Sequence, residues 1–198
     1  KGAPQFGLDD LRRIVECARQ LGIRTFAHCS GSDGIDVAVR AGVDSIEHGF
    51  FMTPEILRRM ADQGTAWVPT FSPVDFRWRR PDVAGWSAPT VARLRAILDA
   101  HREHVALAAR LGVNLVAGSD AGSPGVEHGR GLIDELNHFL DCGLSMERTL
   151  RAASSLPRRL WGAPAAEIRV GATVDLTLFD EDPFRDRAHL DHVASALR

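Results

Sequence analysis

The sequence predicts an α/β protein built on a parallel sheet, in the form of half of a TIM-type (β/α)8 barrel followed by a short β segment. One pattern occurs four times: a helical stretch, a glycine that ends it, a short apolar run, and a polar residue at the end of that run. Between the runs, apolar residues recur with helical spacing. Strands that alternate with helices in this way form parallel sheets covered by helices.

The four runs place polar side chains at matched positions, namely His28, His48, Thr70 and Asp120. The first three of these lie six positions after the glycine that ends the preceding helix. In the fourth run the same offset reaches Gly118, and Asp120 follows two positions later. Because a two-residue step keeps a side chain on the same face of a strand, we expect all four at one rim of the sheet.

Two architectures fit this pattern, an open doubly wound sheet and part of a (β/α)8 barrel. Barrels build their active sites from the C-terminal ends of several strands, so polar residues at four strand ends favour the barrel. Four strands are half of the eight that a barrel needs, and half a barrel leaves two strand edges unpaired. We therefore expect the other half of the barrel to come from a longer protein or another chain.

Each expected helix carries an apolar stripe on one side. The expected helices are one capped by Asp9 or Asp10 and ended by Gly22, one opened by Thr53 and Pro54 and ended by Gly64, and three over about 87–111, 131–142 and 146–160. The segment 71–86 is expected to be a long loop, able to cover a substrate and to hold a carboxylate with its arginines.

Two domains are predicted, the half-barrel over 1–162 and a partial β-subdomain with a truncated tail over 163–198. Gly162-Ala163-Pro164 breaks the repeating pattern. The runs 168–170 and 174–179 then alternate as a half-buried strand pair, with its turn at Gly171-Ala172.

The composition is that of an ordinary globular protein. The 198 residues include 26 acidic and 24 basic side chains, for a formal charge of −2, and 44% of them are hydrophobic. This balance excludes a basic nucleic-acid binder, a disordered acidic chain and a disulfide-rich mini-domain. Of the basic residues, only Lys1 is a lysine, so chemistry that needs a lysine must use Lys1 or do without.

The expected location is the cytoplasm. The three cysteines are odd in number and lack C-x-x-C spacing, which indicates free thiols in a reducing compartment. No run approaches the roughly 18 apolar residues that span a membrane. The chain begins at Lys1 with no targeting segment after it, so we expect that this is not its natural start. A homo-oligomer is compatible with the sequence.

His28, His48 and Asp120 are the candidate metal ligands. Imidazoles at the ends of neighbouring strands can share one divalent ion, and a nearby carboxylate can bind the same ion and take a proton from water. The alternatives are rim histidines without a ligand, and an aspartate that caps a turn in a glycine-rich loop.

The loop 122–131 contains a second set of candidates. His128 could contact a substrate, or it could be a simple loop histidine. The loop could also cradle a phosphate at a helix N-terminus with the help of Arg130, although it lacks P-loop spacing. His101 and His104 are expected on a solvated helix face, and Cys29 is expected to be a small buried thiol.

Four motifs resemble the metal-dependent amidohydrolase superfamily, and within it the imidazolonepropionase-like and Xaa-Pro dipeptidase (prolidase)-like subgroup. They are Phe-Ala-His-Cys-Ser-Gly from position 26, Asp-Ser-Ile-Glu-His-Gly from 44, Val-Ala-Gly-Ser-Asp-Ala-Gly from 116, and Val-Gly-Ala-Thr-Val-Asp-Leu-Thr-Leu-Phe-Asp from 170. The resemblance covers nearly the whole chain, in order.

The resemblance implies strands 5–8 of the barrel, a flanking β-subdomain, and one or two divalent ions with zinc as the expected metal. His28 would match the metal ligand of the fifth strand and His48 that of the sixth. Asp120 would match the eighth-strand aspartate that binds metal and acts as general base, and His128 would lie near the substrate. The family's first-strand His-x-His pair and fourth-strand bridging lysine have no counterpart here, because the chain has no H-x-H and Lys1 precedes the first helix too closely.

The function that this implies is hydrolysis of a C–N bond in a small amide or peptide, such as a dipeptide or cyclic amide, by a metal-activated water. Two alternatives remain open at this stage. One is a metal-poor, non-catalytic fragment that serves as a scaffold or binding module, and the other is a phosphate-binding barrel.

Overall fold

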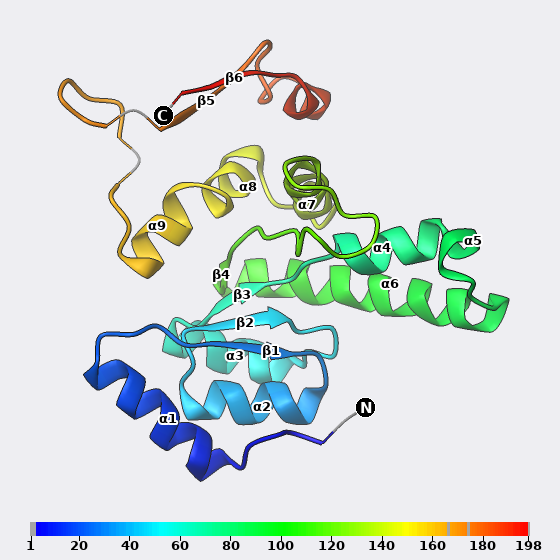
Figure 1. The fold of residues 1–198 in the computed structure, drawn as a ribbon, viewed down its shortest axis with the longest axis vertical. Coiled ribbons are helices and arrows are strands. Elements are labelled where there is room, and N and C mark those ends of the chain that lie inside the picture. Colours follow the sequence, from blue (N-terminus) through cyan, green and yellow to red (C-terminus); the bar gives the residue numbers. More distant parts are fainter. Residues whose placement is uncertain (1–2, 166, 174, 198) are drawn as a thin grey trace.

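The computed structural model describes residues 3–165, 167–173 and 175–197, and its centre is a four-stranded parallel sheet (Figure 1). The strands are β1 (Phe26–Cys29), β2 (Ser45–His48), β3 (Ala66–Val68) and β4 (Asn114–Leu115), and they lie side by side in chain order. A parallel sheet of four strands joined by helices was predicted, and it is confirmed.

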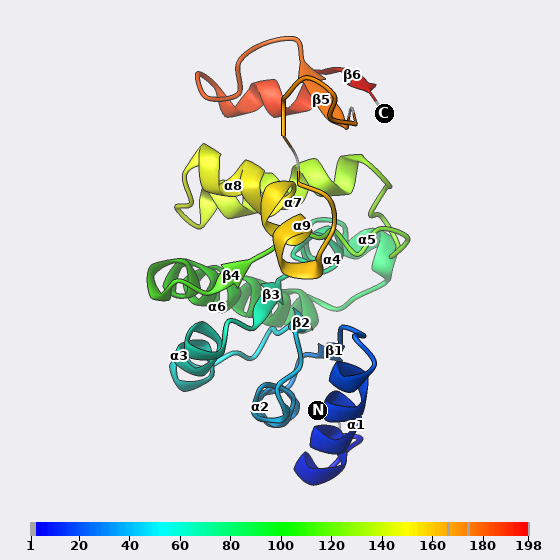
Figure 2. The same ribbon diagram turned by 90° about the vertical axis from the view of Figure 1, so that its left-hand side faces the viewer.

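Helices connect and cover the strands. In chain order they are α1 (Leu8–Gln20), α2 (Ser32–Ala41), α3 (Pro54–Gln63), α4 (Ser72–Arg79), α5 (Pro81–Ala84), α6 (Ala88–Leu111), α7 (Arg130–Asp141), α8 (Met146–Ala152) and α9 (Ser155–Trp161). Figures 1 and 2 show α2, α3 and α6 packed along one side of the sheet, with α7 to α9 beyond β4.

The signals that begin and end α3 match the predicted ones. The Thr53 side chain accepts a hydrogen bond from the Ile56 N–H, which satisfies one of the free amides at the helix start. Pro54 occupies the first turn, where its missing N–H costs nothing. Gly64 ends the helix with φ of 75°, a conformation that favours glycine.

Three local predictions were wrong. The residue before α1 is Gly7, so Asp9 and Asp10 lie inside the first turn of the helix. There their negative charges interact favourably with the positive end of the helix dipole. The expected helix over 146–160 is two helices, α8 and α9, with a break at Ser154.

The third wrong prediction is the long loop over 71–86, which contains α4 and α5. Pro73 lies in the first turn of α4, and the Arg79 guanidinium pairs with the Asp75 carboxylate one turn earlier at 2.6 Å. These two features stabilise a helix in a segment whose apolar residues show little helical periodicity.

The two faces of the sheet pack differently. Ile46, Trp67 and Leu115 belong to the main core under the outer helices, and all three are at most 3% exposed. The alternate residues of β3, Ala66 and Val68, join Val116 in a second cluster on the opposite face, against Leu156 and Leu160 of α9. Trp67 therefore faces the covering helices, and its strand neighbours face the other way.

The predicted C-terminal strand pair exists, but one of its two strands was predicted in the wrong place. Strand β5 (Leu176–Phe179) pairs antiparallel with β6 (Val193–Leu197), and residues 168–170 form no strand. Val174, the expected start of the strand, lies outside the described residues. A turn is present at Gly171, where φ is 83° and the Ala172 N–H donates to the Arg169 carbonyl, but it precedes β5 and does not join the two paired strands as predicted.

A short helix, η1 (Arg187–Asp191), ties this C-terminal unit to α7. The Asp191 carboxylate pairs with Arg130 at 2.6 Å, and Arg187 pairs with Asp141 at 2.6 Å. In both views the unit stands beyond α7 to α9, away from the four-stranded sheet (Figures 1 and 2). None of the helices among the described residues is both long and apolar enough to cross a membrane.

Candidate active site

The two histidines predicted at neighbouring strand ends lie in direct contact. His48 Nε2 is 2.7 Å from His28 Nδ1, and the ring centroids are 4.4 Å apart with the planes at 76°. In the strand register His48 pairs with Cys29 and His28 pairs with Glu47, so the two histidines lie at neighbouring positions of adjacent strands, one residue out of register. Two imidazole nitrogens thus converge at one rim of the sheet.

Three of the four predicted rim residues share an uncommon backbone conformation. His48, Thr70 and Asp120 have φ of 69°, 52° and 54°, and no other non-glycine residue among those described has a positive φ. A left-handed φ turns the chain sharply at the end of a strand and costs about 1–3 kcal/mol per residue. Such strain is found most often at functional sites.

Asp120 lies close enough to influence the histidine pair electrostatically. Burial and the neighbouring His28 lower the pKa of His48, and the Asp120 carboxylate opposes that shift. The same carboxylate accepts a hydrogen bond from Ser123 Oγ at 3.0 Å, within the turn that follows β4. The Asp120 carboxylate therefore acts on His48 through its charge, from the turn that follows β4.

The donor chemistry fits a divalent ion in part. Each histidine turns one ring nitrogen toward the other, and imidazole nitrogen is a preferred ligand of zinc. Across the described ranges, however, no three side chains of His, Cys, Asp or Glu lie close enough together to hold a metal ion. The pair can therefore supply two ligands, and further ligands must come from a shift of Asp120 or from residues beyond this chain.

His48 is held from the neighbouring strand at both its ring and its backbone. Its Nδ1 is 2.7 Å from Thr70 Oγ1, and the indole N–H of Trp67 donates to the His48 carbonyl at 3.0 Å. Thr70 was predicted at this rim only as the polar residue that ends the third run. The contact of Trp67 had no counterpart in the sequence reasoning.

His128 lies in the loop that follows Asp120. It is exposed in the loop before α7, close to Gly122. Arg130, the expected phosphate contact, is occupied by two carboxylates, Asp134 at 3.0 Å and Asp191 at 2.6 Å. That pairing weakens the phosphate-binding alternative.

His101 was predicted on a solvated face, and this was wrong. The side chain is 0% exposed, its Nε2 bonds to the Pro69 carbonyl at 3.0 Å, and burial lowers the pKa of His101 to about 3. A sequence signal was present, because Leu98, His101 and Val105 have the spacing of one buried helix face. His104, which shares the prediction, is half-buried.

Cys29 behaves as predicted for a structural thiol. It is partly buried, and burial together with the neighbouring Glu47 raises the pKa of Cys29 to about 11. A thiol with that pKa is a weak nucleophile at neutral pH.

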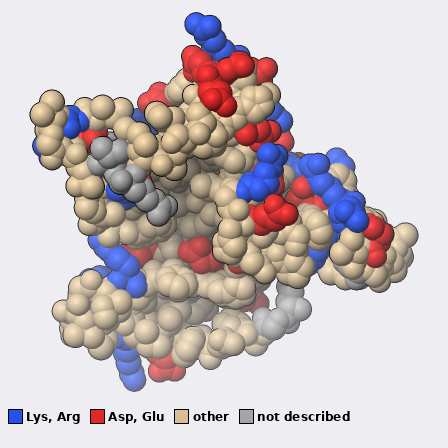
Figure 3. Space-filling model, turned by 45° about the horizontal axis from the view of Figure 1, so that its top comes forward, with Lys and Arg blue, Asp and Glu red and all other residues tan. Residues whose placement is uncertain are grey.

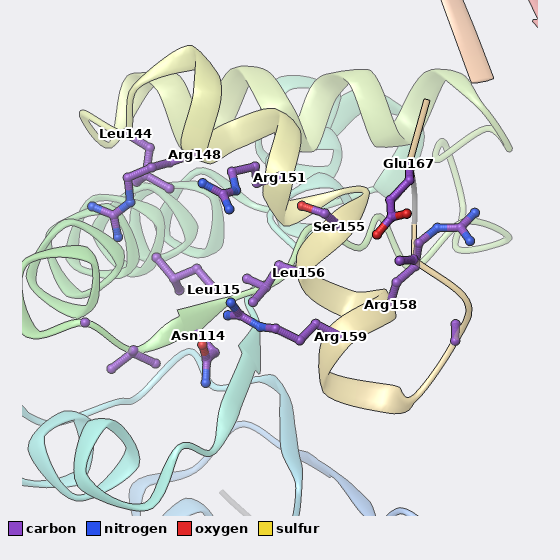
Figure 4. A pocket seen from close by; sticks show the side chains of 14 residues that line it. Asn114, Leu115, Leu144, Arg148, Arg151, Ser155, Leu156, Arg158, Arg159 and Glu167 are labelled. Carbon is purple, nitrogen blue, oxygen red and sulfur yellow. The ribbon is translucent and has the colours of Figure 1, made fainter. Parts of the chain in front are cut away.

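Two cavities lie beside the edge strands of the sheet. One of about 880 Å³ runs along β1 and is lined by His28 and by Phe26, whose side chain is 74% exposed. The other, of about 670 Å³, begins at the N-terminal end of β4, opposite to Asp120, and contains arginines from α8 and α9 (Figure 4). Among these, Arg151 pairs with Glu147 and Arg158 pairs with Asp175.

Acidic and basic side chains are interspersed on the face drawn in Figure 3, which is hollowed near its centre. No broad basic patch is visible on that face. This distribution agrees with the near-neutral charge of the sequence.

The fold and this rim define a member of the amidohydrolase family, and the chain belongs to it: the family model "Amidohydrolase family" matches residues 1–197. An uncharacterized protein of Mycobacterium tuberculosis is 33% identical over 190 residues, which are 96% of this chain and 50% of the relative. The ochratoxinase of Aspergillus niger is 27% identical over 186 residues, which are 92% of this chain and 38% of that enzyme.

Solved structures show the same similarity. A Xaa-Pro dipeptidase with methionine bound in its active site matches with a TM-score of 0.86 and 25% identity, over 100% of this chain and 49% of that one. A prolidase complexed with N-methylphosphonate-L-proline matches with a TM-score of 0.80 and 25% identity, over 98% of this chain and 48% of that one. The chain thus spans about half the length of the proteins it matches.

Proposed function

We propose that this chain contributes one half of the active site of a metal-dependent hydrolase that cleaves the C–N bond of a small amide or peptide, such as a dipeptide or cyclic amide. The observation that carries the proposal is the approach of His28 Nδ1 to His48 Nε2 at the ends of adjacent strands, and the Asp120 carboxylate acts on His48 through its charge. Family membership and the prolidase and ochratoxinase relatives support amide hydrolysis.

In this proposal the four strands are strands 5–8 of a (β/α)8 barrel, residues 1–162 form the half-barrel, and 163–198 belong to a flanking β-subdomain. The exposed edge of β1, with Phe26 and the cavity beside it, is where the N-terminal half of the barrel would pair. That half would supply the remaining ligands.

The chemistry divides among the residues as follows. His28 and His48 would hold a divalent ion, which we propose to be zinc, and Asp120 would be its third ligand from this chain. When bound, the ion polarises the substrate carbonyl and lowers the pKa of water. The Asp120 carboxylate accepts the proton of the attacking water and returns it to the leaving nitrogen. His128 would contact the substrate from the loop before α7.

Metal analysis of the complete protein tests this proposal. His28→Ala and His48→Ala should each lower the zinc content, because each removes one ligand, while His192→Ala, an exposed histidine of the C-terminal unit, should leave it unchanged. Unchanged zinc content in both ligand variants would contradict the assignment. Absence of zinc from the unaltered protein, with no hydrolysis of a panel of dipeptides and cyclic amides, would favour a scaffold.

A further inference from the structure

We propose that Thr70 is a positioning residue that sets the tautomer and the direction of the His48 ring. The first observation is the 2.7 Å separation of Thr70 Oγ1 and His48 Nδ1. If the threonine oxygen accepts, Nδ1 carries the proton and Nε2 keeps its lone pair. The lone pair on His48 Nε2 then points toward His28, whose Nδ1 lies 2.7 Å away.

The tautomer matters because a histidine binds a cation through an unprotonated nitrogen. The hydrogen bond at one ring nitrogen determines which nitrogen is free for a ligand. For both histidines of the pair to offer lone pairs to one ion, His48 must carry its proton on Nδ1, next to Thr70. The role of Thr70 in ion binding therefore rests on the proposed function, whereas the ring orientation does not.

The second observation is the cost of placing the hydroxyl there. Thr70 is 4% exposed and has φ of 52°, although it is β-branched and the left-handed region is unfavourable for such side chains. A glycine or asparagine would adopt that backbone with less strain. The hydroxyl contact with His48 gives a physical reason for a threonine at this position.

The third observation is that buried groups hold the backbone on both sides of Thr70. His101 Nε2 bonds to the Pro69 carbonyl at 3.0 Å. Glu135 Oε1 accepts hydrogen bonds from the Ser72 N–H at 2.6 Å and from Ser72 Oγ at 2.7 Å. Both anchoring side chains are 0% exposed, so the strained residue is held by the interior.

These anchors come from helices that contribute no ligand, α6 and α7. With Trp67 on the His48 carbonyl, they form a continuous set of contacts from the helix layer to the histidine ring. Because an inflexible support keeps a ligand in the geometry of the bound state, the set lowers the cost of ordering His48 when an ion binds.

The test compares Thr70→Val with Thr70→Ser in the complete protein. Valine keeps the shape and the β-branch but removes the oxygen, while serine restores it. Zinc affinity, measured by competition with a chromogenic chelator, should fall about 10–100-fold in Thr70→Val and recover to within a few-fold in Thr70→Ser. Thr149→Val is the matched control, since it removes a fully buried threonine hydroxyl in α8 that has no hydrogen-bond partner within the part of the chain that the structure describes.

A spectroscopic measurement separates this role from a merely structural one. In the metal-stripped protein with labelled histidine, long-range ¹⁵N–¹H spectra should show His48 protonated on Nδ1, and Thr70→Val should change that tautomer population. The His48→Ala spectrum assigns the signals. An unaltered protein with its His48 proton on Nε2 would overturn the proposal even if Thr70→Val did not fold.

The outcomes distinguish the two proposals. Zinc binding by the unaltered protein with equal affinity in Thr70→Val would overturn the role of Thr70 and leave the proposed hydrolase in place. Failure of the unaltered protein to bind zinc would refute the proposed metal site, and the tautomer spectra would still decide what Thr70 does to His48.

Discussion

Glu135 is a buried carboxyl group whose ionisation should make the stability of the protein depend on pH. The side chain is 0% exposed, and burial raises its pKa to about 7, against the opposing effect of the hydrogen bonds from Ser72. The neighbouring Asp134 adds a smaller upward shift. The second carboxyl oxygen has no hydrogen-bond partner among the described residues.

The direction of the effect follows from proton binding. Between pH 4.5 and 7 the unfolded chain has lost the proton that the folded protein still holds, so the free energy of unfolding falls as pH rises. A pKa raised from its ordinary 4.5 to about 7 corresponds to about 3 kcal/mol across that window. The stabilising contribution is complete below pH 4.5 and is lost as pH passes 7.

Glu135→Gln should remove this dependence, because glutamine resembles the protonated acid and its carbonyl can still accept both bonds from Ser72. The assay is urea unfolding of the complete protein at half-unit steps from pH 4.5 to 8. We expect the difference in stability between the variant and the unaltered protein to shift by about 3 kcal/mol in favour of the variant across this range.

Comparing variants in this way cancels the titration of other groups, including His138 on the same helix, whose pKa burial lowers. Glu147→Gln is the control, since it removes an exposed carboxylate from α8. A pH-independent difference between Glu135→Gln and the unaltered protein would refute the reasoning, as would a carboxyl ¹³C titration of Glu135 with its midpoint below pH 5.

Three further substitutions test the packing and chemistry of the rim. Gly49→Ala should lower the free energy of unfolding by about 1–3 kcal/mol more than Gly64→Ala does, as measured by urea unfolding. Both glycines have positive φ, but only at Gly49 would the new Cβ lie 2.7 Å from Trp67 Nε1. Equal losses in the two variants would show that Trp67 moves away without a cost in stability. Gly118→Ala places a Cβ 2.6 Å from Val68 Cγ1, so it should also destabilise the protein by about 1–3 kcal/mol. In the double variant, Val68→Ala should recover part of that loss. If the stability losses of the two single variants simply add in the double variant, there is no clash between these side chains. If the protein hydrolyses an amide as proposed, Asp120→Asn should lower kcat about 10²–10⁴-fold, because the asparagine side chain cannot accept the proton. Near-normal kcat would exclude Asp120 as the general base.

The periodic parts of the fold were predictable from local pattern. Thr53, Pro54 and Gly64 set the limits of α3 through contacts within the helix itself. The positions of His28 and His48 near the ends of β1 and β2 followed from a repeated offset, whereas Asp120 lies in the turn after β4 rather than at the strand end. Neighbouring parallel strands end at the same rim, so the contact between the two histidines was also within reach of the sequence.

The wrong predictions concern segments whose structure depends on contacts with residues distant in the sequence. The segment 71–86 lacks a clear apolar stripe, and α4 forms because its Ser72 and Asp75 are held by α6 and α7. The partner of β5 is β6 rather than 168–170, because the hairpin closes around η1, which is anchored to α7 by Asp191 and Arg187.

By itself the sequence indicated the four parallel strands, the helices that join them in a repeating pattern, and the family to which the chain belongs. Tertiary structure alone decided that Thr70 would contact His48 and that the Glu135 carboxyl group would be buried with its hydrogen bonds directed to Ser72. The physical reason is the distance along the sequence over which each kind of interaction acts. Helix caps and strand periodicity act within a few residues, whereas burial of a polar side chain depends on partners tens of residues away, such as the 63 positions that separate Ser72 from Glu135.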